Sequence, residues 1–253
     1  MLELHKVSKK FGGVTAVDDC TFRIQKGKIT AIIGPNGSGK TTLFNLISGI
    51  EQADSGSIVF NGSDITKLSV EAIAGKGISR SFQKTRLFAN LTVRENLDLA
   101  RDRDNTLFWK NFIFRRNHDG KAQNDLLKKL GIQHIADLRA DSVSYGQRKL
   151  TEIARTIMMP HSLLLLDEPV AGVNRKIKDK LVRLFMELKE QKKTLLLIEH
   201  DMRFTLNVAD IIIYMDKGSV VTQGSPAEIQ KNLQVADAYL SQRDPGIPQE
   251  TCS

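Results

Sequence analysis

The segment Gly34–Thr41 reads G-x-x-x-x-G-K-T, the spacing of a phosphate-binding P-loop. An apolar run over Ile29–Ile33 leads into it, and a helix-like segment over Thr41–Ile50 leads out of it. Glycines let successive backbone N–H groups point at one anion, and a helix start adds unpaired N–H groups and the positive end of its dipole. The segment therefore predicts a polyphosphate site.

Two side chains of this segment have predicted roles. Lys40 is expected to reach the β- and γ-phosphates of a nucleotide, and the Thr41 hydroxyl is expected to hold Mg²⁺. The remaining residues predicted to surround the phosphates are Gly34, Pro35, Asn36, Gly37, Ser38, Gly39 and Thr42. The alternative is a glycine-rich turn with an unrelated lysine, and the full motif between a strand and a helix argues against it.

Two adjacent carboxylates follow a second apolar run. Leu163–Leu166 has the continuous apolar character of a strand buried on both faces of a parallel sheet, and Asp167 and Glu168 come directly after it. Carboxylates at the end of a buried strand are costly unless they have a cation or a chemical role. We expect Asp167 to assist Mg²⁺ and Glu168 to orient and deprotonate a water that attacks the γ-phosphate.

Two further polar residues stand at predicted strand ends. His200 follows the apolar strand Thr194–Ile198, and Gln83 ends the strand predicted over Gly77–Phe82. His200 is expected to hydrogen-bond the γ-phosphate, with a purely structural histidine as the alternative. Gln83 is expected to complete the shell of the metal ion and to report its presence to a moving loop, with an ordinary exposed glutamine as the alternative.

A second helix start offers a separate anion site. Apolar residues recur at helical spacing from Gly146 to Met159, so Ser144 and Gly146 lie at the beginning of that helix, beside Gln147. Simple N-capping by Ser144 is the alternative.

Near the amino terminus, apolar residues alternate with polar ones, which predicts an antiparallel sheet beside the α/β core. Phe11 lies just before the turn Gly12-Gly13 and is a candidate to stack on an adenine ring. A lone aromatic in a core is the alternative.

The remaining pattern predicts more elements around these residues. The Asn61-Gly62 pair indicates a hairpin after a strand over Ser57–Phe60, and capping boxes begin helices at Thr92 and Ser225. The other expected elements are helices over Leu68–Ala74, Val93–Ala100, Asp125–Leu130 and Arg175–Lys189, a closing hairpin of Ile211–Met215 and Val220–Gln223, and a last helix ending near Leu240.

One insert differs in composition from the rest of the chain. Residues Arg101–Lys121 mix charges with aromatic side chains that include Phe108 and Trp109. They predict a contact surface for a partner subunit or a lipid headgroup region, or a small helical hairpin that covers its own apolar face. We expect an α/β core with an antiparallel β subdomain over residues 1–83 and 161–240, a helical subdomain over 84–160 and a flexible tail over 241–253.

Composition sets bounds on the class of protein. The chain has 253 residues, a net charge of +8 and two cysteines, Cys20 and Cys252, whose spacing resembles no metal or redox motif. No stretch approaches the ~20 apolar residues that span a bilayer, and Met1–Lys10 has no apolar signal segment. We therefore expect a soluble protein of a reducing cytosol. The basic charge fits polyphosphate, nucleic acid or an anionic membrane face.

These motifs together resemble the ATP-binding subunit of ABC transporters over essentially the whole chain. Gly34–Thr41 is similar to the Walker A motif and Leu163–Asp167 to the Walker B motif, with Glu168 next. The resemblance also places the A-loop aromatic at Phe11, the Q-loop at Gln83, the signature at Ser144-Tyr145-Gly146-Gln147 and the H-loop at His200. It implies a P-loop NTPase core with a parallel sheet flanked by helices, and a Mg²⁺-dependent ATPase coupled to transport.

Two departures point to one branch of the family. The signature usually opens Leu-Ser-Gly-Gly, whereas this chain has Val143 and Tyr145, and the D-loop Ala171–Asn174 ends in Asn where the wider family has Asp. Both features are similar to importers of branched-chain or other hydrophobic amino acids, or of urea and amides. The lipopolysaccharide-export ATPase is similar but lacks so long an insert.

The resemblance also implies partners. Two ATPase chains, identical or homologous, would face head to tail, so that ATP on Lys40 of one is closed over by Ser144 and Gly146 of the other. Membrane permease subunits would hold the pair at the cytoplasmic face of the cell membrane, and an extracytoplasmic solute-binding protein would act indirectly. An ABC ATPase acting on nucleic acid, and a P-loop kinase or GTPase, are competing classes, and no nucleic-acid partner is expected.

Overall fold

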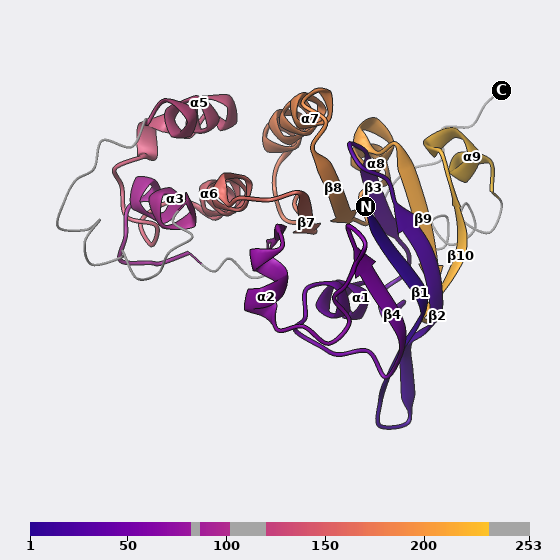
Figure 1. Ribbon diagram of the computed structural model, residues 1–253. Helices are drawn as coiled ribbons and strands as arrows, with labels where there is room; N and C mark the ends of the chain where they lie inside the picture. Colours follow the sequence, from indigo (N-terminus) through magenta and orange to yellow (C-terminus); the bar gives the residue numbers. More distant parts are fainter. Residues whose placement is uncertain (82–86, 102–119, 233–253) are drawn as a thin grey trace, which may run out of the picture.

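The computed structural model describes residues 1–81, 87–101 and 120–232 (Figure 1). One sheet has four antiparallel strands in the order β2-β1-β4-β5, and the other has six strands in the order β10-β9-β3-β8-β7-β6. The first sheet consists of β1 (Leu2–Phe11), β2 (Val14–Ile24), β4 (Ser55–Phe60) and β5 (Ser63–Asp64). The second consists of β3 (Ile29–Ile33), β6 (Ile78–Arg80), β7 (Leu163–Asp167), β8 (Thr194–Ile198), β9 (Ile211–Asp216) and β10 (Ser219–Gly224).

Helices cover both sides of the six-stranded sheet. They are α1 (Lys40–Ile47), α2 (Val70–Gly75), α3 (Val93–Arg101), α5 (Lys121–Leu130), α6 (Tyr145–Met158), α7 (Arg175–Glu190), α8 (Met202–Val208) and α9 (Pro226–Lys231), with a 3-10 turn over Gln133–Ile135. Figure 1 shows α7 on one side of this sheet and α1, with the antiparallel sheet, on the other. The structure confirms the predicted α/β fold with its helices, its antiparallel sheet and its central sheet, which is parallel except for the antiparallel edge strand β10.

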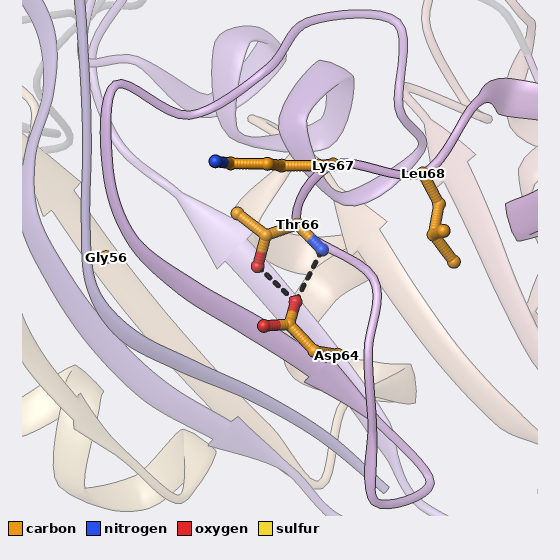
Figure 2. A pocket seen from close by; sticks show the side chains of 5 residues that line it. All are labelled: Gly56, Asp64, Thr66, Lys67 and Leu68. Atoms are coloured by element: carbon orange, nitrogen blue, oxygen red, sulfur yellow. Dashed lines mark hydrogen bonds between the residues drawn. The ribbon is translucent and has the colours of Figure 1, made fainter.

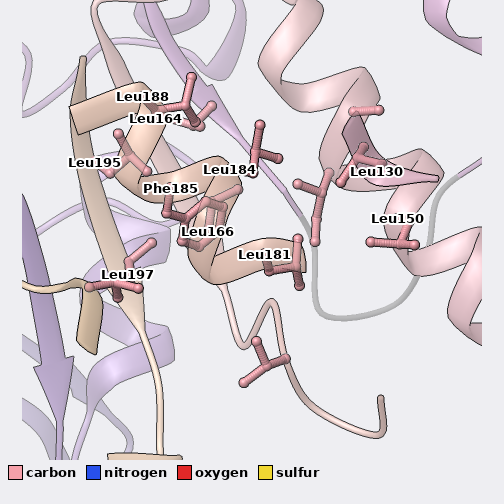
Figure 3. Packing of buried hydrophobic residues seen from close by; sticks show 14 of the residues in the cluster. Leu130, Leu150, Leu164, Leu166, Leu181, Leu184, Phe185, Leu188, Leu195 and Leu197 are labelled. Carbon is pink, nitrogen blue, oxygen red and sulfur yellow. The ribbon is translucent and has the colours of Figure 1, made fainter. Parts of the chain in front are cut away.

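Side-chain alternation in the central strands builds two hydrophobic cores. On β7, Leu164 and Leu166 face a cluster that includes Leu181, Leu184 and Phe185 of α7, which Figure 3 shows from close by. Leu163 and Leu165 of the same strand face the opposite cluster, together with residues of α1 and of the antiparallel sheet. Because both faces are covered, these strands are apolar without a break, as the sequence predicts.

The helical part shares the first of these cores. Leu130 of α5 and Leu150 of α6 belong to the same cluster as the leucines of α7 and of the sheet (Figure 3). The boundary of a separate helical subdomain at residues 84–160 remains a prediction. Within the described residues, no helix combines the length and the apolar character needed to cross a bilayer.

Candidate functional site

Three neighbouring strands bring the predicted catalytic groups to one edge of the sheet. β3 is parallel to β8, and β8 is parallel to β7, so their carboxyl ends lie side by side. The P-loop follows β3, Asp167 ends β7 and is followed by Glu168, and His200 comes two residues after β8. The chain therefore gathers a phosphate-binding loop, two carboxylates and an imidazole in one place.

The backbone of the P-loop requires glycine at two positions. Gly34 has φ +152°, and a Cβ placed on it would lie 2.0 Å from the carbonyl oxygen of Met215. Gly39 has φ +95°, and a Cβ there would lie 2.2 Å from the carbonyl oxygen of Ala16. Gly39 is also the N-cap of α1 and has no side chain that could compete with an anion for the first turn. The loop thus presents backbone N–H groups at a helix start.

The Lys40 side chain lies inside this loop. Its Nζ donates to the carbonyl oxygens of Gly34 and Pro35, both at 2.8 Å, and to Ser38 Oγ at 3.3 Å. Burial lowers the pKa of Lys40, and the nearby carboxylates of Glu168 and Asp167 act in the opposite direction. The ammonium group and the two carboxylates therefore influence one another across the strand ends.

Asp167 has one oxygen engaged and one available. Its Oδ2 lies 3.4 Å from Nη2 of the buried Arg80, whereas its Oδ1 is buried without a hydrogen-bond partner among the described residues. Burial raises the pKa of Asp167, and the Arg80 guanidinium opposes that shift. A buried oxygen that lacks a donor fits a cation. The part of the chain that the structure describes holds no cluster of three or more acidic, His or Cys side chains suited to a metal.

Glu168 occupies an unusual backbone conformation. Its φ is +47°, in the left-handed region, and its N–H donates to the carbonyl oxygen of Ile198 at 3.0 Å. This places Oε1 of Glu168 3.7 Å from Nδ1 of His200. Left-handed conformations of residues other than glycine are costly and often occur at functional sites. The conformation and the facing imidazole single out Glu168 at this edge.

One residue of the site was not found from the sequence. Glu199 is fully buried, and its Oε1 accepts a hydrogen bond from the Val170 N–H at 3.0 Å. Its Oε2 accepts from the His200 N–H at 3.3 Å, so one carboxyl group joins the end of β8 to the loop after β7. The one signal for Glu199 in the sequence is that a charged residue directly follows a buried strand.

Glu199 gives a testable pH dependence. Burial raises its pKa from 4.5 to about 7, against the opposing hydrogen bonds from Val170, Asp201 and His200. The folded state binds a proton on the Glu199 carboxyl group more tightly than the unfolded state does, so protonation of Glu199 stabilises the fold. This stabilisation is complete below the unfolded-state pKa and is lost as pH rises through about 7. Relative to Glu199→Gln, the wild type should lose about 2–3 kcal/mol of unfolding free energy between pH 5 and pH 8.

Urea unfolding at the two pH values measures this difference. Glu190→Gln, at the exposed end of α7, is the matched control because it also replaces a carboxylate by an amide. It should show the same pH dependence as the wild type. Parallel curves for Glu199→Gln and the wild type would contradict the prediction.

The remaining predicted residues lie in three places. Ser144 caps α6 in a box with Gln147, through Ser144 N–H to Gln147 Oε1 at 2.9 Å and Gln147 N–H to Ser144 Oγ at 3.3 Å. Figure 1 shows the start of α6 in the helical part, away from α1. Phe11 is 45% exposed and pairs with Val14 in the β1–β2 hairpin, near the segment that contacts Gly39. Gln83 and most of the aromatic insert lie outside the described residues.

A surface pocket lies elsewhere, at the antiparallel sheet (Figure 2). Its lining residues are Gly56, Asp64, Thr66, Lys67 and Leu68. The Asp64 carboxylate accepts hydrogen bonds from the Thr66 N–H at 2.8 Å and the Thr66 hydroxyl at 2.5 Å, which lower the pKa of Asp64. These bonds close a local turn, and the residues that line the pocket include none of the predicted catalytic residues.

Comparisons with known proteins show to which family the chain is similar. A family model described as ABC transporter matches residues 17–171. The chain is 37% identical over 250 residues to the high-affinity branched-chain amino acid transport ATP-binding protein BraF of Pseudomonas aeruginosa, covering 96% of this chain and 98% of that protein.

Two solved structures share the fold. The ADP conformation of MJ1267, an ATP-binding cassette of an ABC transporter, has a TM-score of 0.82 and 32% identity, covering 96% of this chain and 99% of that one. A dimeric post-hydrolysis state of the ATP-binding cassette MJ0796, bound to ADP and Pi, has a TM-score of 0.74 and 25% identity, covering 89% and 99%. With the family match over more than half of its length and a relative that it covers almost completely, the chain belongs to the ABC transporter family.

Proposed function

We propose that the chain is the ATP-binding and ATP-hydrolysing subunit of an importer for branched-chain or other hydrophobic amino acids. The observation that carries the proposal is the convergence of Lys40, Asp167, Glu168 and His200 at one sheet edge. It occurs in a chain that resembles BraF along nearly its whole length. The name of that relative favours amino acids over urea, amides or lipopolysaccharide.

ATP would bind with its phosphates in the P-loop. The backbone of Gly34–Thr41, together with Thr42, would hold the phosphate oxygens, and Lys40 would exchange its hydrogen bonds to Gly34 and Pro35 for the β- and γ-phosphates. Phe11 would stack on the adenine ring. The support for this role is its exposed ring on a hairpin whose second strand contacts the P-loop through Ala16.

Mg²⁺ would be held by the Thr41 hydroxyl, Asp167 and Gln83, shared with the phosphates. The support is the buried Asp167 Oδ1, which has no partner among the described residues. The ion would neutralise charge on the phosphates during transfer.

Hydrolysis would depend on the two residues that face each other past the strand ends. Glu168 would accept a proton from the attacking water. Its left-handed backbone conformation places its carboxylate at the same sheet edge as Lys40 and His200. His200 would hydrogen-bond the γ-phosphate and keep it in line with that water. Most of the rate enhancement would come from positioning and charge neutralisation.

A second chain would complete the site. Figure 1 shows α6 away from α1 of the same chain. The residues at its start, Ser144, Gly146 and Gln147, would therefore serve the nucleotide of a partner in a head-to-tail pair. The dimeric structure of the MJ0796 cassette supports pairing of two cassettes. The partner would be a second copy or a homologous ATPase. The pair would sit on membrane permeases at the cytoplasmic face and respond to an extracytoplasmic solute-binding protein.

A transport assay tests the proposal. In cells that lack the gene for this chain, uptake of labelled leucine at low concentration should fall to background. A plasmid copy of the wild type should restore it, whereas Glu168→Gln should not, and Glu190→Gln is the control that should. Leucine uptake that survives the deletion while urea or amide uptake is lost would assign the chain to the other importer branch.

A further inference from the structure

The ring of Tyr145 lies against a glycine of the loop after β7. Tyr145 is the first residue of α6, and Gly172 has φ +69° in the loop Ala171–Asn174. A Cβ placed on Gly172 would lie 3.1 Å from Cε1 of Tyr145 and 3.5 Å from its hydroxyl oxygen. The ring therefore packs against the open side of Gly172, and a side chain at that position would force the ring to shift by a few tenths of an ångström.

A second contact joins the same two segments. A Cβ placed on Gly146, the next residue of α6, would lie 2.7 Å from Cδ1 of Ile177 in the first turn of α7. Gly146 of α6 thus faces a side chain of α7, and Gly172 of the loop before α7 faces a side chain of α6. The start of α6 and the start of α7, with the loop before it, form one continuous contact.

The loop Ala171–Asn174 is held at both ends and also within, where the Val173 N–H donates to the Val170 carbonyl oxygen at 3.5 Å and Val173 is buried. Before it, the Val170 N–H donates to Glu199, and at its end Asn174 Oδ1 accepts from the Ile177 N–H at 3.1 Å and caps α7. Gly172 lies between these anchors, and glycine has the widest conformational freedom of any residue. The Tyr145 ring limits this freedom from outside the loop, because it lies against Gly172.

We propose that Tyr145 is a positioning residue that holds the loop Ala171–Asn174 against the signature turn Ser144–Gln147, so that both move as one surface toward the partner chain. The inference rests on the head-to-tail pairing proposed above. It explains a departure from the family's usual signature: tyrosine stands where the signature usually has glycine, and its ring is accommodated by a glycine in the loop. Asn174 caps α7, and the ring adds a separate contact that holds Gly172 beside the signature turn.

A double-mutant cycle tests the inference in the full-length chain. All variants carry Glu168→Gln so that an ATP-bound pair accumulates, and light scattering gives the ATP concentration for half-maximal pairing. Tyr145→Ala and Gly172→Ala should each raise this concentration about tenfold. Gly172→Ala also strains the backbone at φ +69°, whichever residue stands at position 145, so the informative step is Tyr145→Ala. Its effect should be smaller in the Gly172→Ala background than in the parent, because the added methyl group has already displaced the ring.

Two controls separate positioning from folding. Tyr145→Phe keeps the ring edge on Gly172 and should stay within about twofold of the parent, whereas Leu138→Ala removes a side chain of similar exposure, 49% against 48%, elsewhere in the helical part. Leu138→Ala should leave pairing unchanged. Without ATP, the urea midpoint of Tyr145→Ala should match that of the parent, a result that a purely structural role would not give.

The outcomes distinguish this inference from the proposed function. A parent that does not pair when given ATP would overturn head-to-tail pairing of two copies of this chain, and the inference with it. A parent that pairs, with effects of Tyr145→Ala and Gly172→Ala that multiply in the double variant, would overturn the inference alone. So would a Tyr145→Ala variant with the ATP dependence of the parent.

Discussion

Replacement of Glu168 by glutamine is expected to stop steady-state ATP hydrolysis while ATP still binds. Glutamine has nearly the same shape as glutamate but cannot accept a proton from water at the γ-phosphate. Removal of a general base commonly lowers the rate by a factor of about 10²–10⁴, and we expect a loss of that size in kcat. The P-loop and Lys40 are unchanged in this variant, so ATP should accumulate on the protein and hold it in an ATP-bound pair.

Three measurements check this expectation: phosphate release for turnover, a fluorescent ATP analogue for affinity, and light scattering for pairing. Glu190→Gln makes the same chemical change at the exposed end of α7 and should hydrolyse ATP like the wild type. A Glu168→Gln variant that hydrolyses ATP at a near wild-type rate would refute Glu168 as the base. A variant that neither hydrolyses nor binds ATP would instead show that Glu168 supports the nucleotide site itself.

The central strands were the most predictable part of the fold. β3 and β8 occupy the predicted ranges Ile29–Ile33 and Thr194–Ile198, because strands covered on both faces are continuous apolar runs. The Asn61-Gly62 hairpin is confirmed by pairing of Phe60 with Ser63, and both turn residues have positive φ. In each case the signal is local in sequence.

Elements whose burial depends on distant partners were less predictable. α5 begins at Lys121, earlier than the predicted start at Asp125, and its first turn buries Gln123 through hydrogen bonds to Arg94 and Asp98 of α3. The short helix α8, Met202–Val208, was not predicted. Its seven residues are too few to show a helical repeat, although Asp201 caps it by accepting from the Phe204 N–H at 2.9 Å.

The candidate site divides in the same way. The P-loop, Asp167 and Glu168 follow apolar strands directly, so their place at one edge follows from the order of residues and parallel pairing. The buried Arg80 beside Asp167 belongs to a strand far away in sequence, and its contact depends on β6 lying next to β7. The burial of Glu199 and the ring of Tyr145 on Gly172 likewise arise from contacts between distant segments.

Replacement of Lys40 by alanine is expected to weaken ATP binding by about 100-fold, because a charged donor to the β- and γ-phosphates is lost from a buried loop. The same change leaves the carbonyl oxygens of Gly34 and Pro35 without their lysine donor. The nucleotide-free protein should therefore also lose about 1–3 kcal/mol of unfolding free energy. Titration with a fluorescent ATP analogue measures the first effect, and urea unfolding without nucleotide measures the second.

Because the chain is basic, part of any loss in ATP affinity could come from the lower net charge alone. Lys67→Ala removes the same charge from an exposed side chain at the antiparallel sheet (Figure 2) and controls for this effect. It should bind ATP within about twofold of the wild type, since exposed charges beyond the screening length of about 10 Å act weakly at 0.1 M salt. Equal losses in the two variants would assign the effect to net charge, and unchanged binding by Lys40→Ala would remove Lys40 from the phosphate site. A loss confined to Lys40→Ala places its ammonium group at the phosphates, where the hydrogen bonds to Gly34 and Pro35 already hold it inside the loop.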